Sequence, residues 1–358
     1  MLFVKRYRPS CRYVVLFIIL LTISICLKFN IEFDRNSIDL SSKESFHVNL
    51  NFTSNTPVCK ANDRLIIYIL STVINFQRRK VIRSTWASPL PDTCFVFILG
   101  NPRDSSTQLL VQQEKQQYRD IAQIDHEETY ANVVYKEVGA LQWSAHFHPS
   151  ISYLFKTDDD LILDSIIISE LVQVLITNVI NTTSYISRHR PSLNEELLSS
   201  DRTKFFRGGW SMDFQPTLRY SKFAVSESVW PHPVLPLYCS GFGWLMSKNI
   251  RDRLVQTSHV YPLNKVAWIG DVFTSGFLAR AAKVKCTGIA LDFEQTASAN
   301  CSCLMAQQPM LTVCSSTFHG GGGGDYDAEK HKEYEKAWKV IRRRHDVNEK
   351  SRTSIEDC

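Results

Sequence analysis

The sequence predicts an α/β protein with a mostly parallel, doubly wound sheet, and two regular features carry this prediction. Three continuous apolar runs have the composition of strands buried on both faces, at 64–71, 94–100 and 153–157. The segments between them have helical patterning, at 75–86, 107–119 and 131–147. Strands that alternate with helices in this order form a parallel sheet with helices on both faces.

Individual elements also have local signals. The helix expected at 75–86 stops before Pro89, which cannot continue a helix. In the segment 131–147, four apolar residues fall on one helical face: Val134, Val138, Leu141 and Ala145. Asp164 is placed to cap a helix that runs to about Asn178. The second half is less regular, because four prolines interrupt it at 216, 231, 233 and 236.

Length and charge limit the classes of function. The 358 residues suffice for a substantial core, and 44% hydrophobic with 22% charged residues is ordinary for a globular protein. The net charge of +5 owes much to four residues near the N-terminus: Lys5, Arg6, Arg8 and Arg12. No long basic face with interleaved aromatic residues is present, so the sequence does not favour a nucleic-acid partner.

The N-terminal segment predicts a membrane anchor. An apolar run at 13–29 follows a basic segment at 1–12, and no Ala-x-Ala-like cleavage site comes after it. Positive charge before the span keeps the 1–12 tail cytosolic and places the rest of the chain in the lumen. The polar segment 30–60 is expected to be a stem. The alternative is a cleaved signal peptide.

Glycosylation sequons and cysteines agree with a lumenal body. The sequons begin at Asn51, Asn181 and Asn300. Eight cysteines follow the anchor, enough for up to four disulfides in an oxidising compartment, with the connectivity left open. A zinc site is the weaker alternative, because Cys301 and Cys303 lack the spacing of zinc ribbons.

Three consecutive carboxylates end the apolar run at 153–157. Asp158, Asp159 and Asp160 repel one another, so their proximity needs a compensating charge. A hard cation such as Mn²⁺ or Mg²⁺ prefers carboxylate oxygens, and ligands of open α/β sheets bind at the carboxyl ends of strands. A solvated acidic turn is the alternative interpretation.

Five short motifs follow one another along the chain: Arg78-Arg79-x-x-Ile82-Arg83-x-Thr85-Trp86, Tyr130-x-Asn132-x-x-x-Lys136, Phe155-Lys156-x-Asp158-Asp159-Asp160, Tyr238-Cys239-Ser240-Gly241-x-Gly243 and Asp271-Val272-x-x-x-Gly276. In this order they resemble glycosyltransferase family 31, the β-1,3-galactosyl- and β-1,3-N-acetylglucosaminyltransferases. The resemblance implies a GT-A-like domain at 61–319, with a nucleotide-binding half and an acceptor-binding half. A glycine hinge and charged tail are expected at 320–358.

The resemblance also implies roles for individual residues. The expected donor-site residues are Arg78, Arg83, Trp86, Lys156, Asp158, Asp159, Gly241 and Gly243. Asp158 and Asp160 are expected to hold Mn²⁺ or Mg²⁺, and His319 is a further candidate ligand. Trp244 is placed to stack on a sugar of the acceptor, although a buried aromatic residue fits its position equally well. A solvated helix face is the alternative for the basic residues at 78–80.

The resemblance also implies that Asp271 is the catalytic base. Inversion in one displacement needs a base to take the proton of the acceptor hydroxyl, and a carboxylate suits this role. The family pattern has a Glu-Asp pair here, and this chain has Gly270 in place of the Glu. The departure leaves the base itself in place. It bears on acceptor binding at 270 and on the positioning of the base.

The function expected from these motifs is an inverting β-1,3-hexosyltransferase of the Golgi membrane, type II in topology. The donor is expected to be UDP-galactose, with UDP-GlcNAc and UDP-GalNAc as alternatives, and the acceptor a glycan on a glycoprotein or glycolipid. Gly270 supports a second class, an inactive glycan-binding or chaperone-like relative. A metal-dependent hydrolase is a third class, but the sequence lacks the His-rich or two-metal pattern typical of one.

Overall fold

The computed structural model describes residues 58–294, 300–315 and 328–346. Seven of its strands form the central sheet: β1 (Leu65–Leu70), β2 (Thr93–Asn101), β3 (Ile121–Glu127), β4 (Tyr153–Asp158), β6 (Phe206–Gly208), β9 (Trp244–Ser247) and β10 (Thr287–Gly288). Their order is β10-β6-β9-β4-β1-β2-β3. Among these strands β9 alone is reversed, since it pairs antiparallel with both β4 and β6 while the other pairs are parallel. The predicted mostly parallel sheet is therefore confirmed.

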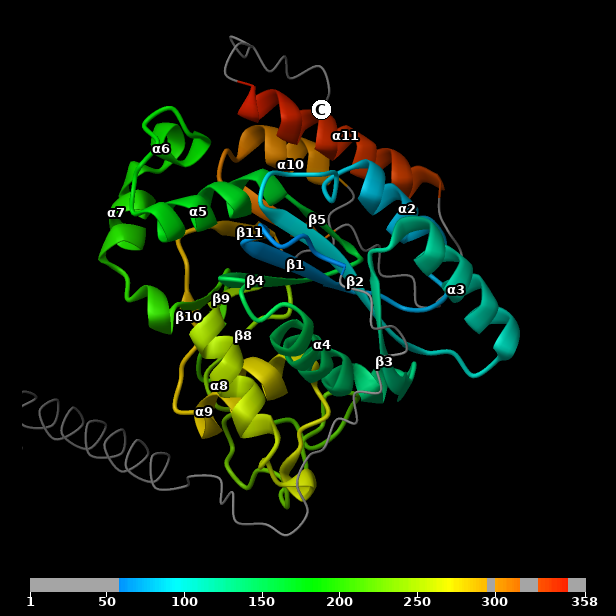
Figure 1. Cartoon of the computed structure of the whole chain (residues 1–358). Coiled ribbons are helices and arrows are strands. Elements are labelled where there is room, and N and C mark those ends of the chain that lie inside the picture. Colours follow the sequence, from blue (N-terminus) through cyan, green and yellow to red (C-terminus); the bar gives the residue numbers. More distant parts are fainter. Residues whose placement is uncertain (1–57, 295–299, 316–327, 347–358) are drawn as a thin grey trace, which may run out of the picture. The chain divides into compact units, whose positions relative to one another are not determined.

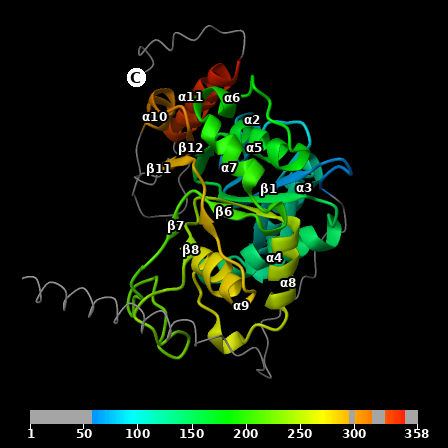
Figure 2. The ribbon, with the colours of Figure 1, turned by 90° about the vertical axis from the view of Figure 1, so that its left-hand side faces the viewer.

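Helices cover both faces of this sheet (Figure 1). The longer ones are α2 (Phe76–Ser84), α3 (Ser105–Tyr118), α4 (Val133–Phe147), α5 (Ser165–Thr177), α7 (Pro191–Ser199), α8 (Lys248–Ser258) and α11 (Ala328–His345). Shorter ones are α6 (Tyr185–His189), α9 (Ala279–Ala281) and α10 (Cys301–Gln307). Figure 2 shows α2, α5, α10 and α11 above the sheet and α4 and α8 below it. This arrangement is the predicted doubly wound α/β architecture.

The predicted elements form where their local signals place them. All six residues of β1 are buried, as a strand covered on both faces requires. Asp164 caps α5, because its carboxylate accepts hydrogen bonds from the backbone N–H groups of Ile166 and Ile167. That cap was predicted from the sequence, and so was the end of the helix near Asn178.

A second, smaller sheet begins directly after the three carboxylates. It contains β11 (Asp292–Glu294), β12 (Leu311–Ser315) and β5 (Leu161–Leu163) in that order. Because β4 belongs to the large sheet and β5 to the small one, the turn at 158–160 joins the two sheets. A further pair consists of β7 (Ser211–Met212) and β8 (Tyr238–Cys239). The acidic turn is thus flanked by two strands, β4 and β5, each of which is hydrogen-bonded in its own sheet.

The C-terminal helix α11 packs into the body, although the sequence predicted a charged tail beyond a hinge. It buries one stripe of residues in the core with α2 and α10 at its side: Tyr334, Ala337, Val340 and Ile341. Near its end, Arg344 and His345 both contact the buried carboxylate of Asp164. The predicted end of the domain at 319 is therefore too early. The glycine hinge lies outside the described residues.

Three disulfides fix part of the connectivity that the sequence left open. They join Cys59 to Cys94, Cys239 to Cys286 and Cys301 to Cys314. Cys303 is also disulfide-bonded. Because Cys59 and Cys94 are paired with each other, their position beside Asp63 is not a metal site.

The membrane anchor expected at 13–29 and the sequon at Asn51 lie outside the described residues. Within the described ranges, no helix is long and apolar enough to cross a membrane. Asn181 and Asn300 are both exposed. The side-chain Oδ1 of Asn300 caps α10 by accepting a hydrogen bond from Cys303 N at 3.2 Å.

Candidate active site

The middle carboxylate of the acidic turn anchors the turn to the protein. Asp159 is buried, and its carboxylate accepts hydrogen bonds from Ser71 Oγ at 2.6 Å, Asn75 Nδ2 at 2.9 Å and Arg78 Nη1 at 2.9 Å. The Tyr334 hydroxyl donates to the Asp159 backbone oxygen at 3.1 Å. These contacts hold the turn against α2 and α11, and the donor-binding role expected for Asp159 stays a prediction.

The two outer carboxylates have the chemistry of a hard-cation site. Burial, reinforced by the charges of Asp158 and Asp159, raises the pKa of Asp160 to about 7. Burial also raises the pKa of Asp158, against the attraction of Lys156. A divalent cation would supply the positive charge that the turn lacks, and carboxylate oxygens suit Mn²⁺ or Mg²⁺. The turn therefore fits the predicted metal, while His319 lies outside the described residues.

Lys156 joins the acidic turn to a glycine loop from the second half of the chain. Its side chain is only 2% exposed, and Nζ donates to Asp158 Oδ2 at 2.8 Å and to the Gly241 carbonyl oxygen at 2.5 Å. Burial lowers the pKa of Lys156, but the charges of Asp158 and Glu137 outweigh it and raise the pKa overall. In this structure Lys156 is thus a buried link between two loops, and the donor-binding role expected for it stays a prediction.

The two glycines of the loop serve different purposes. A Cβ at Gly241 would lie 3.3 Å from Lys156 Nζ and 3.4 Å from Asp271 Oδ2, so Gly241 lets the loop pass close to both charged groups. A Cβ at Gly243 would lie 2.7 Å from the ring of Phe155, so Gly243 permits packing against β4. Gly241 therefore lies between the charged groups of the site, whereas Gly243 packs the loop against β4.

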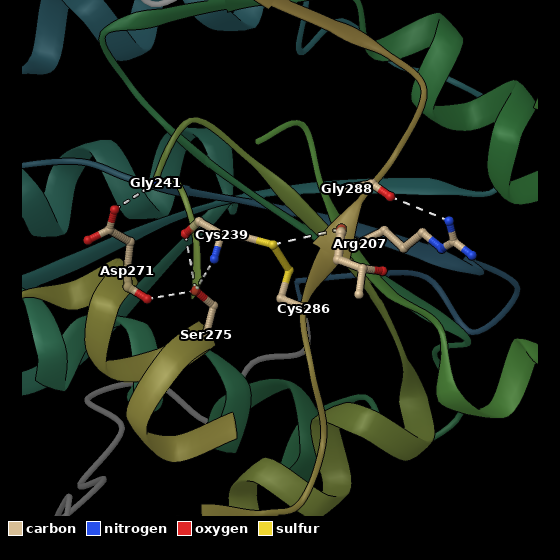
Figure 3. Close-up of a disulfide and its surroundings, with 8 residues drawn as sticks. Arg207, Cys239, Gly241, Asp271, Ser275, Cys286 and Gly288 are labelled. Atoms are coloured by element: carbon tan, nitrogen blue, oxygen red, sulfur yellow. Dashed lines mark hydrogen bonds between the residues drawn. A yellow bond between two sulfur atoms is a disulfide. The ribbon is translucent and has the colours of Figure 1, made fainter. Parts of the chain in front are cut away.

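Asp271 is held at the start of a π-helix, Val272–Leu278, in a fixed orientation (Figure 3). Its Oδ1 accepts a hydrogen bond from Val272 N at 2.9 Å, and its Oδ2 accepts one from Gly241 N at 2.9 Å. The Ser275 hydroxyl donates to the Asp271 backbone oxygen at 2.7 Å and also contacts Cys239, which is disulfide-bonded to Cys286. Single π-turns inside helices occur frequently at functional sites.

The environment of Asp271 makes it a stronger proton acceptor than an ordinary aspartate. Burial raises its pKa, and Lys156 and the two backbone N–H groups oppose that shift only in part. Proton transfer is most efficient when the pKa of the base approaches the working pH. The side chain is half-buried, and a carboxylate in this position can take a proton from a bound hydroxyl group.

Comparison with known proteins identifies the family. A family model described as Galactosyltransferase matches residues 77–289, more than half of the chain. The chain belongs to the galactosyltransferase family. The match and the relatives below confirm the resemblance to glycosyltransferase family 31.

Two relatives show how similar the chain is to other members. UDP-GalNAc:beta-1,3-N-acetylgalactosaminyltransferase 1 of Sus scrofa is 28% identical over 230 residues, which is 62% of each chain. Beta-1,3-galactosyltransferase 5 of Mus musculus is 25% identical over 221 residues, which is 60% of this chain and 63% of the relative. The chain therefore spans less than two thirds of the length of these curated relatives. A solved structure of the galactosyltransferase LgtC with donor and acceptor sugar analogues is 9% identical, with a TM-score of 0.36. The match covers 77% of this chain and 95% of that one.

In this galactosyltransferase-family chain the basic motif of α2 divides into exposed and buried parts. Arg78 is 36% exposed and uses Nη1 to contact Asp159, so its guanidinium lies at the acidic turn and is accessible to solvent. Arg83 donates to Glu114 and Asp120, which ties α2 to α3 and its following loop. We therefore correct the donor-binding role expected for Arg83, whose guanidinium is held by these carboxylates.

Both tryptophans expected to touch a substrate are core residues. Trp86 and Trp244 are each 0% exposed. Trp86 follows α2 and packs in the main hydrophobic cluster, and Trp244 lies in β9 with its ring centroid 5.1 Å from Lys156 Nζ. The expected donor contact of Trp86 and sugar stacking of Trp244 are wrong, and the buried-aromatic alternative for Trp244 is right.

The structure adds three residues that sequence reasoning missed. Glu137 of α4 carries a buried carboxyl group 3.7 Å from Lys156 Nζ. Tyr130 is exposed. Partial desolvation raises its pKa, and the nearby charge of Asp271 raises it further. Trp268 is also exposed, two residues before Gly270. A Tyr inside a family motif was an available signal for Tyr130, whereas an isolated Glu in an apolar helix was none for Glu137.

Proposed function

We propose that this protein is an inverting β-1,3-hexosyltransferase that moves a sugar from a UDP-sugar to a hydroxyl group of a glycan on a glycoprotein or glycolipid. UDP-galactose is the first donor to consider, and UDP-GalNAc follows because one relative is named for it. Family membership supports the reaction class. The observation that carries the proposal is the half-buried carboxylate of Asp271, held by Gly241 N and Val272 N beside the acidic turn.

The residues of the site divide the work of one displacement. Asp271 accepts the proton of the acceptor hydroxyl as the new glycosidic bond forms, and the bond from the sugar to UDP breaks on the opposite face. Asp158 and Asp160 would hold Mn²⁺ or Mg²⁺, which neutralises the charge that develops on the diphosphate leaving group. Arg78 adds a solvent-accessible cation at the same turn.

The proposed location is the Golgi membrane, with the described body in the lumen and a single N-terminal anchor at 13–29. The three disulfides support an oxidising compartment, because such bonds are rare in cytosolic proteins. Exposed sequons at Asn181 and Asn300 agree with that compartment. A mature protein that carries no N-glycans and whose cysteines are free thiols would contradict this location.

A donor screen tests the function. The full chain is produced in a secretory-pathway host and assayed in solubilised membranes with UDP-galactose, UDP-GalNAc and UDP-GlcNAc, in Mn²⁺ and then in EDTA. We expect Mn²⁺-dependent transfer that falls by about two to four orders of magnitude in Asp271→Asn, the usual worth of a positioned base. Glu195→Gln is the matched control, since it makes the same kind of change on an exposed face of α7.

The same screen separates an enzyme from an inactive relative. Transfer by the wild type with an unimpaired Asp271→Asn variant would move the base to another residue. If the protein binds UDP but transfers sugar from none of the donors, the proposed enzyme function would be wrong. That result would favour a glycan-binding or chaperone-like protein, the alternative that Gly270 supports.

A further inference from the structure

A carboxyl group from another element occupies the space beside Gly270. Gly270 is buried just before Asp271, and a Cβ added to it would lie 2.9 Å from Glu137 Oε1 and 3.0 Å from Val133 Cγ1, both on α4. The backbone at Gly270 does not lie in the left-handed region, so available space rather than backbone conformation favours glycine here. The Glu137 carboxyl group therefore stands where a side chain at 270 would begin.

Glu137 has one cationic neighbour and lies beside the helix that begins at the base. It is 1% exposed, and its Oε1 is 3.7 Å from Lys156 Nζ. Its Oε2 forms no hydrogen bond of normal geometry within the described residues, although the nearby Thr274 hydroxyl of the π-helix favours the charged form. Burial raises the pKa of Glu137 to about 7, against Lys156 and with the charge of Asp271. A buried, incompletely paired carboxylate destabilises a fold, so packing alone does not explain it.

A short series of contacts leads from Glu137 to the base. Lys156, which faces Glu137, donates to the carbonyl oxygen of Gly241. The N–H group of Gly241 donates in turn to Asp271 Oδ2. Lys156 also holds Asp158 of the acidic turn. Lys156 thus contacts both loops, and Glu137 of α4 faces its Nζ at 3.7 Å.

We propose that Glu137 is a positioning residue for catalysis, which supplies from α4 the second carboxylate that the family pattern carries at 270. In its charged form Glu137 holds Lys156 between the acidic turn and the Gly241 loop, and the loop orients Asp271. The absence of a side chain at Gly270 then leaves room for the Glu137 carboxyl group. This inference rests on the proposed function, because its effect is on sugar transfer.

Glu137→Gln is the first test, because it keeps the shape and removes the charge. We expect kcat to fall by about 10- to 100-fold, the cost of a small misplacement of a catalytic group. The KM for the donor is expected to stay within about twofold, because Glu137 does not touch the donor in this proposal. Thermal unfolding and UDP binding of the full-length chain are measured in parallel.

Relocation of the carboxylate is the second test. Gly270→Glu alone puts two carboxyl groups into one space, so we expect it to lower activity and stability together. Glu137→Ala empties that space, and Glu137→Ala/Gly270→Glu is expected to regain at least about tenfold in kcat over Glu137→Ala. The matched control is Glu137→Ala/Gly270→Gln, which fills the space without charge and should not regain it.

The outcomes distinguish this role from the proposed function. An active wild type with unchanged kcat in Glu137→Gln would overturn the role of Glu137 alone. Equal rescue by Gln and Glu at 270 would also overturn it, because packing would then suffice. A folded wild type that transfers no sugar would overturn the proposed function, and the positioning role with it.

Discussion

Replacement of Asp164 by alanine is expected to release α11 from the body of the protein. The Asp164 carboxylate is 0% exposed at the start of α5, where it accepts hydrogen bonds from Ile166 N at 3.2 Å and Ile167 N at 3.1 Å. From α11, Arg344 Nε donates to it at 2.9 Å, and His345 Nε2 lies 2.9 Å from the same oxygen. One buried side chain therefore both caps α5 and docks α11.

The cost follows from these contacts. Loss of the cap of α5 is worth about 1 kcal/mol. Removal of one partner from a buried ion pair costs about 3–5 kcal/mol. The lower value applies here, because Arg344 also donates to the backbone oxygens of Leu311 at 2.8 Å and Pro309 at 3.1 Å. The total is about 4 kcal/mol, which corresponds to about 8–16 °C in Tm for a domain of roughly this size.

Thermal unfolding of the full chain measures this effect. Asp164→Asn keeps a capping oxygen but not the charge, so its Tm is expected to lie between those of the wild type and Asp164→Ala. Arg344→Met removes the other partner, and the double variant Asp164→Ala/Arg344→Met should cost less than the sum of the single variants. A Tm of Asp164→Ala within about 2 °C of the wild type, or additive costs in the double variant, would refute the reasoning.

Three further predictions concern the acidic turn, the base and acid stability. Asp160→Asn should abolish transfer and weaken UDP binding in Mn²⁺ without a loss of Tm. Calorimetric titration with UDP, in Mn²⁺ and in EDTA, measures the change in binding. Full activity of the wild type in EDTA would exclude the metal. Because the pKa of Asp271 is raised, kcat/KM should begin to fall on the acid side at a pH above the pKa of an ordinary aspartate, about 4. A value of kcat/KM that is still constant down to about pH 4 would contradict this. Burial raises the pKa of Asp164, but His345 and Arg344 outweigh burial and hold this pKa at about 2. The stabilisation that Asp164 provides is therefore complete above about pH 4 and is lost as the pH falls through about 2. Acid unfolding of Asp164→Asn should lack that loss, and an unaltered acid transition would contradict the assignment.

Local signals made much of the fold predictable. The apolar runs became β1, β2 and β4, and the cap at Asp164 formed as expected, because strands buried on both faces and helix caps depend on residues close in the sequence. The charged segment beyond 327 was misjudged because most of its residues are charged. A narrow stripe at helical spacing, from Tyr334 to Ile341, is nevertheless enough to bury one side of α11.

The sequence grouped site residues only where several motifs pointed to one chemistry. The structure brings Asp271 and the acidic turn together through Lys156 and Gly241, and their roles in catalysis and metal binding stay predictions. Trp86 was misjudged because an aromatic residue in a motif can pack or bind, and only the packing of distant residues around it in the core decides which. Glu137 was missed because its relation to Gly270 joins residues far apart in the chain, for which one sequence holds no signal.

The docking of α11 has a consequence for how the protein is made. Tyr334 bonds the acidic turn from 175 positions later in the chain, and Arg344 reaches Asp164 from 180 positions later. At about 5–20 residues per second, a ribosome needs about 10–40 s to cover that distance. During that interval the turn and the buried charge of Asp164 lack these partners. Nascent chains arrested before Ala328 should therefore be cleaved by protease near the acidic turn, and equal protection of such chains would show that the turn becomes rigid without its last helix.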